Sequence, residues 1–139
     1  MVFIHDEGVF DVSIDRIWKY LQDPGAHRHE SVLHQEVLEQ KENTMKLRRE
    51  MKSPMGGKEE EVVRLTLNPP FGFVAEVLDG SKKGSKHAHT YVPMGDKTKV
   101  IVAGDFHVHG LDEAATIKAT LDYFASVFDE DNATLRQYR

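Results

Sequence analysis

The chain has 139 residues, which is the size of one domain, and we expect a single unit over residues 1–139. It contains no cysteine, which excludes disulfide bonds, thiolate metal sites and a cysteine nucleophile. Its net charge of −5 argues against a nucleic-acid or anionic membrane partner, because both call for clustered cations. The first residues reach a charge at once, so we expect no signal peptide, no membrane insertion and a cytoplasmic protein.

The chain begins with a predicted strand followed by a short helix. Residues 2–12 mix β-branched and aromatic side chains with polar ones, as strands do. Ser13 is a candidate N-cap for a helix over residues 14–22, which ends at the Pro24-Gly25 break. The apolar residues of this helix recur at helical spacing: Ile14, Ile17, Trp18 and Leu21. A further helical turn is expected at residues 26–31.

From residue 33 to residue 110 the pattern becomes strand and turn in alternation. Six strands are predicted, over residues 33–41, 44–52, 60–67, 71–79, 85–94 and 98–109. Their connections are short and rich in Gly, Asn and Pro, so consecutive strands should form an antiparallel meander.

The last part of the chain changes to helical periodicity. Asp112 is a plausible N-cap for one long amphipathic helix of about 35–40 Å. Its apolar residues recur at steps of three and four: Ala114, Ile117, Leu121, Phe124, Phe128 and Leu135. The aromatic face must pack against something, and the sheet is the only large partner.

The order of these elements resembles the START-like (SRPBCC) helix-grip superfamily, which includes the birch-pollen allergen and polyketide cyclases. The segment FDVSIDRIWKYLQDP (residues 10–24) also resembles the family's opening, in which a strand leads to a helix with a Trp and an Asp-Pro end. Many relatives have a tryptophan soon afterwards, whereas residues 25–33 contain none, so the subfamily stays open. The resemblance implies an α+β fold, in which a seven-stranded antiparallel curved sheet grips the C-terminal helix, with one or two short helices between strands 1 and 2. It also implies a cavity between sheet and helix for an apolar or amphipathic small molecule.

Strand register predicts where the histidines of SKHAHTYVPMGDKTKV (residues 85–100) point. If Gly95-Asp96 is a two-residue turn, Met94 pairs with Lys97, and His87, His89 and Tyr91 share the valine face of the next strand. That face must be buried, so these three residues should point inward.

The alternation of side chains between the two faces of the sheet gives two further expectations. A three-residue loop over residues 80–82 would place Phe73 opposite His89 and Ala75 opposite His87, again on the inner face. His107 and His109 of the last strand should then face solvent.

The same parity places two charged residues inward, Arg49 beside Met51 and Glu61 beside Val63. Buried charges are costly unless they pair or meet water. The polar end of a water-filled cavity would resolve that cost; alternatively, the strand ends are out of register and both residues are solvated.

Three roles compete for the inward histidines. They can orient a ligand in an apolar pocket, or act with Tyr91 and Arg49 as acid–base catalysts of a cyclisation or dehydration. They can also take two positions on zinc, with a third ligand from His34 or Glu61. We expect no metal and no cofactor, since no phosphate loop, nucleophile elbow or zinc-protease motif is present. His27, His29 and His34 are expected at the surface.

The function predicted from these observations is binding, or transport, of a small molecule such as a lipid, isoprenoid, quinone or polyketide. The alternatives are a cyclase- or dehydratase-type enzyme in the same cavity and a co-chaperone-like interaction module. A homodimer is the assembly expected from base rates. The predicted ligand-binding residues are Trp18, Arg49, Glu61, Val63, Phe73, His87, His89, Tyr91, Val102, Phe106, Leu121, Phe124 and Phe128.

Overall fold

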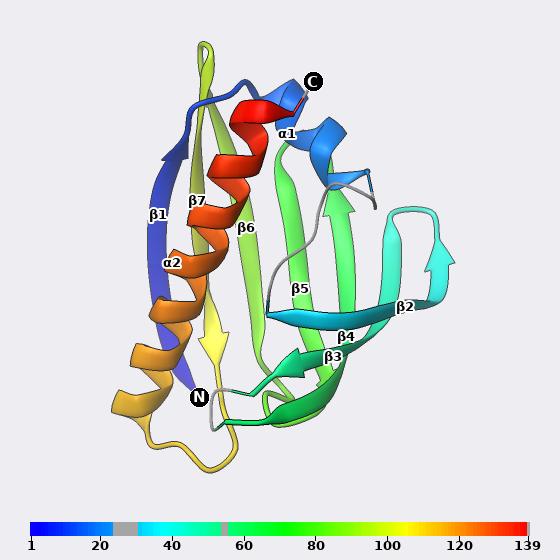
Figure 1. Cartoon of the computed structure of the whole chain (residues 1–139), viewed down its shortest axis with the longest axis vertical. Coiled ribbons are helices and arrows are strands. Elements are labelled where there is room, and N and C mark those ends of the chain that lie inside the picture. Colours follow the sequence, from blue (N-terminus) through cyan, green and yellow to red (C-terminus); the bar gives the residue numbers. More distant parts are fainter. Residues whose placement is uncertain (24–30, 54–55, 139) are drawn as a thin grey trace.

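One antiparallel sheet and a long C-terminal helix make up most of the structure, a computed structural model that describes residues 1–23, 31–53 and 56–138 (Figure 1). The strands are β1 (Val2–Phe10), β2 (Val32–Lys41), β3 (Thr44–Lys52), β4 (Lys58–Asn68), β5 (Gly72–Asp79), β6 (Lys86–Met94) and β7 (Lys97–Phe106). The helices are α1 (Ile14–Leu21) and α2 (Glu113–Gln137). The seven strands lie in the order β1-β7-β6-β5-β4-β3-β2, so the predicted helix-grip architecture is confirmed.

The hairpin register around the inner histidines is the one that the sequence predicts. Met94 pairs with Lys97, and the ladder sets His89 opposite Val102 and His87 opposite Gly104. On the other side of β6, His89 lies opposite Phe73 of β5. The two-residue turn at Gly95-Asp96 determines this register: once Met94 pairs with Lys97, the partner of each other residue in the two strands is fixed.

Several element boundaries differ from the prediction, among them the following three. β1 ends at Phe10 instead of residue 12, because the chain turns there to reach the N-cap position of α1 at Ser13, whose side chain makes no capping hydrogen bond. The β5–β6 connection covers residues 80–85 and is longer than the three-residue loop expected, although the register is the same.

The third difference lies at the end of β7. This strand was expected to reach residue 109 but stops at Phe106. The hydroxyl of Ser85 takes the place of a ladder partner there: Oγ accepts from the His107 N–H at 2.9 Å and donates to the His107 carbonyl at 3.0 Å. The helical turn expected at residues 26–31 lies almost wholly outside the described residues.

Helix α2 spans 25 residues, or about 37 Å. Its N-cap is the predicted one, since Asp112 Oδ1 accepts from the Ala115 N–H at 2.8 Å. The buried face differs from the prediction: Ala114 is exposed, whereas Thr116 and Thr120 are buried beside Phe124. Threonine is apolar enough at its methyl group to pack against a sheet, which a pattern based on apolar residues alone misses.

The sheet is curved, and its strands lie farther from α2 toward the β2 edge. Figure 1 shows α2 lying over β1, β7 and β6, while β4, β3 and β2 bend away from the helix. The main core forms where helix and sheet are closest: Phe10 stacks on Phe128 with ring centroids 4.8 Å apart. Gly8 permits this approach, because a Cβ there would lie 2.7 Å from the Phe128 ring. A separate small cluster on β4 and β5 contains Val63, Ala75 and Val77.

Candidate functional site

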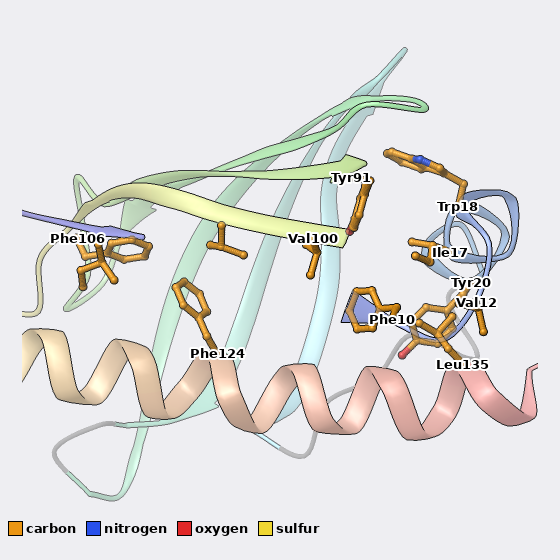
Figure 2. Packing of buried hydrophobic residues seen from close by; sticks show 12 residues of the cluster. Phe10, Val12, Ile17, Trp18, Tyr20, Tyr91, Val100, Phe106, Phe124 and Leu135 are labelled. Carbon is orange, nitrogen blue, oxygen red and sulfur yellow. The ribbon is translucent and has the colours of Figure 1, made fainter. Parts of the chain in front are cut away.

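The inner histidines of β6 lie between the sheet and α2, among aromatic rings. His87 stacks on Phe106 with centroids 5.1 Å apart, and its ring is 5.7 Å from that of Phe124 on α2. His89 stacks on Phe73 at 4.3 Å. Figure 2 shows Phe124 pointing from α2 toward the sheet near Phe106. The inward orientation predicted from strand parity is therefore what the structure has.

The two imidazoles also contact each other. Nε2 of His87 lies 3.1 Å from Nε2 of His89, which is a hydrogen-bond distance. One nitrogen must carry the proton and the other must accept it, so this contact is lost when both rings are doubly protonated. Burial, reinforced by the positive charges of Arg49 and Lys82, lowers the pKa of His87 to about 4. His87 is thus a neutral imidazole at pH 7.

A charged cluster lies on the adjoining strands. Arg49 on β3 and Glu61 on β4 are direct ladder partners, and Arg49 Nη1 lies 4.0 Å from Glu61 Oε2. Lys82, from the β5–β6 connection, places Nζ 3.1 Å from Glu61 Oε1 and 3.9 Å from Glu59 Oε1. Ser81 Oγ donates to Glu59 Oε2 at 2.7 Å. Both Arg49 and Glu61 therefore point inward and are ion-paired.

The space between sheet and helix has a polar end and an apolar end. The charged cluster and His87 lie toward the β5–β6 connection. Thr116 and Thr120 are buried on the N-terminal half of α2, which lies at the same end in Figure 1. At the opposite end Trp18 of α1 meets Tyr91 edge-on with centroids 5.8 Å apart, as Figure 2 shows.

Tyr91 lies at the apolar end of the interior, next to Trp18. Its ring is buried and approaches Phe73 at 6.4 Å. Burial raises its pKa further above the ordinary tyrosine value, with a contribution from the negative charge of Asp131. A phenol held so firmly protonated can donate a hydrogen bond but does not serve as a base near neutral pH.

The other predicted lining residues are distributed along this interior. Val63 belongs to the small β4–β5 cluster, Val102 is buried beside His89, and Leu121 packs against the main core. Phe128 stacks on Phe10 at the β1 side, away from the histidines. Trp18 donates from Nε1 to the Pro70 carbonyl at 2.9 Å, which fixes its indole at the apolar end.

Two depressions on the described surface lie outside this interior. One of about 500 Å³ is lined by Gly80, Ser81, Lys83, His107 and His109, and the other, of about 350 Å³, by the last turns of α2. His109 is exposed and His107 is half-buried, so the predicted solvent-facing pair lies at the edge of the molecule. A closed cavity between sheet and helix stays a prediction.

Among the described residues, no group of three or more His, Asp and Glu side chains is placed to hold a metal ion. His34 is exposed on β2. The next residue of the strand, Gln35, pairs with the inward-facing Arg49, so the side chain of His34 points to the other face of the sheet. His27 and His29 lie outside the described residues. Within the described ranges, neither helix is long and apolar enough to span a membrane.

Sequence reasoning missed several members of this site, among them Lys82, Thr116 and Thr120. Lys82 lies in a turn, from which its long side chain reaches the inner carboxylate of Glu61. The spacing of Thr116, Thr120 and Phe124 at four-residue intervals was the available signal for the two threonines.

No protein-family model and no curated protein matches the chain. Solved structures do match it over nearly its whole length. A START superfamily protein from Mycobacterium smegmatis has a TM-score of 0.84 at 13% identity, with 99% of each chain covered. A protein from Thermus thermophilus has a TM-score of 0.84 at 13% identity, with 98% of each chain covered. The Zhui aromatase/cyclase from a Streptomyces species has a TM-score of 0.74 at 13% identity, covering 96% of this chain and 90% of the enzyme.

These likenesses establish that the protein has the START-like, helix-grip fold. The matched structures include an aromatase/cyclase, but at this level of identity the likeness is one of fold. The chemistry of the site has to be argued from the residues present.

Proposed function

We propose that the protein binds an apolar or amphipathic small molecule between the concave face of the sheet and α2. One observation carries the proposal: Phe73, His87 and His89 are only half-buried, although they lie on interior strands and face the helix. Side chains in a filled core at this position would be excluded from solvent. This exposure in the middle of the concave face supports a ligand site there.

The distribution of polar groups favours an amphipathic guest. Rings of Phe73, Phe106 and Phe124 offer an apolar wall, while Arg49 and Glu61 put hydrogen-bonding groups at one end. Small-molecule sites commonly combine a mainly apolar lining with a few polar groups that fix orientation. Lipids, isoprenoids, quinones and polyketides all meet this requirement.

The test is native mass spectrometry of the protein purified from its own source. We expect an additional mass from a bound organic molecule, released on denaturation. Ala75→Leu fills the inner face opposite His87 and should reduce the occupied fraction, whereas Ala88→Leu makes the same change on the outer face of β6 and should leave it unchanged. A chain that carries no organic molecule, together with a filled interior in a crystal structure, would refute the proposal.

The same spectra separate the remaining hypotheses. A doubled mass would indicate the homodimer expected from base rates. A co-purifying polypeptide in place of a small molecule would favour the interaction module.

Acid–base catalysis is a second candidate, favoured by the 3.1 Å contact between His87 and His89. A neutral imidazole can take a proton from the carbon next to a carbonyl. When this proton is passed to the hydroxyl on the following carbon, the C–O bond breaks, water leaves and a carbon–carbon double bond forms. The test is elimination of water from a 3-hydroxyacyl thioester, followed by mass spectrometry. Wild type should form the unsaturated product and His87→Gln should not; equal rates for the two would leave simple binding as the function.

A further inference from the structure

Arg49 and Glu61 hold charge on the concave face without the hydrogen bonds that buried charges normally make. The Arg49 side chain is 18% exposed and that of Glu61 is 4% exposed. Their closest approach, 4.0 Å from Nη1 to Oε2, is too long for a hydrogen bond.

Each side chain also has a buried polar atom with no hydrogen-bond partner among the described residues: Arg49 Nε and Glu61 Oε1. The Lys82 ammonium, 3.1 Å from Glu61 Oε1, makes an ion pair there but lies outside hydrogen-bond geometry. Buried polar groups in native proteins are almost always satisfied by protein or by ordered water, so water or a polar group of a ligand is the expected partner of these two atoms.

The charges around Arg49 and Glu61 indicate that this partner is electrically neutral. Arg49 and Lys82 face Glu61 and Glu59, so two cations balance two carboxylates. An added ion would disturb this balance, because an anion would meet Glu61 and a cation would meet Arg49. A neutral group with one acceptor and one donor fits both neighbours at once.

We propose that the ligand carries a hydroxyl group close to a carbonyl group at its polar end, and that Arg49 and Glu61 recognise the two together. This inference rests on the proposed function and specifies the ligand class. The Arg49 guanidinium donates to the carbonyl oxygen, and the ligand hydroxyl donates to the Glu61 carboxylate. The apolar remainder of the ligand lies along Phe73 toward Tyr91, at the apolar end of the interior.

The test compares probes with the same ten-carbon chain by isothermal titration calorimetry. Methyl 3-hydroxydecanoate offers both groups, methyl decanoate only the acceptor, 3-decanol only the hydroxyl, and decanoic acid an anion. Hydrogen bonds to charged groups correspond to roughly a tenfold to hundredfold change in affinity. Methyl 3-hydroxydecanoate should therefore bind at least about tenfold more tightly than each of the other three probes.

A paired substitution tests whether Arg49 and Glu61 cause this preference. Arg49→Met with Glu61→Leu removes both charges and keeps similar volume, a change that buried ion pairs often tolerate. We expect this double variant to bind methyl 3-hydroxydecanoate and methyl decanoate with similar affinity, because the partners of both the hydroxyl and the carbonyl group are gone. The matched control is Arg48→Met with Glu36→Leu. It removes an exposed ion pair between ladder partners on β3 and β2, in which Arg48 Nη1 lies 3.0 Å from Glu36 Oε1. It should leave the preference intact.

The outcomes separate this inference from the proposed function. Equal affinity of wild type for all four probes, or a preference that survives in the double variant, overturns the hydroxy-carbonyl proposal while ligand binding stands. Binding of none of the probes also overturns it, whereas the proposed function is judged independently by the mass of the endogenous ligand. If the double variant does not fold, Arg49→Lys, which keeps the charge but has no guanidinium fork, should still reduce the preference.

Discussion

The pKa of His87 makes a quantitative prediction about stability against pH. Its folded-state value of about 4 lies below the ordinary value of 6.5, so the unfolded chain binds this proton more tightly. The contribution to stability is therefore complete above pH 6.5 and is lost as the pH falls toward 4. One pKa unit corresponds to about 1.4 kcal/mol, which gives a loss of about 2.5 kcal/mol between pH 7.5 and pH 4.5.

Urea unfolding of wild type and His87→Gln at several pH values measures this loss. Subtracting the two free energies of unfolding removes the contribution of the other titrating groups. Between pH 7.5 and pH 4.5, wild type should lose about 2.5 kcal/mol of stability relative to His87→Gln. A His87 difference that is flat with pH, or that moves in favour of wild type in acid, would refute the account of a desolvated imidazole beside two cations.

Three further substitutions test the framework of the site. Gly104→Ala would place a Cβ 2.5 Å from the Cα and Cβ of His87, so urea unfolding should show a loss of roughly 1–3 kcal/mol from overpacking and the NMR signal of the His87 ring should move. Leu135→Ala removes a side chain that is 1% exposed and should lower the free energy of unfolding by roughly 2–5 kcal/mol. Tyr20→Phe deletes the 2.8 Å hydrogen bond to Asp131 and should lower it by roughly 1.5–3 kcal/mol in the same assay.

The inward orientation of the histidines was predictable because β-structure has few degrees of freedom. A two-residue turn at Gly95-Asp96 fixes one register, and side chains that alternate between faces carry that register along the whole strand. Once Val100 and Val102 are assigned to the core, the orientation of His89 follows. Arg49 and Glu61 followed from the same parity, which is why both were placed inward from sequence alone.

Interactions made by long or ambiguous side chains were not predictable in this way. Lys82 belongs to a turn, and nothing in its sequence position shows that its Nζ reaches Glu61. Thr116 and Thr120 are counted as polar in any two-class pattern, although they are buried here. β7 ends where the hydroxyl of Ser85, instead of a backbone group, bonds to the main chain of His107. Strand propensities contain no information about such a side-chain hydrogen bond.

Arg49 connects the histidine pair to the charged cluster, and this makes the ligand's charge measurable at His87. The guanidinium is one of the two cations that lower the His87 pKa. A neutral ligand bound to Arg49 leaves that positive charge in place, so the His87 pKa should stay low or fall further as water is displaced. An anionic ligand would offset Arg49 and raise the His87 pKa. Ring-proton NMR titrations should therefore show a higher His87 pKa with decanoic acid bound, and an unchanged or lower one with methyl 3-hydroxydecanoate bound. A rise with the neutral probe would contradict its placement beside Arg49.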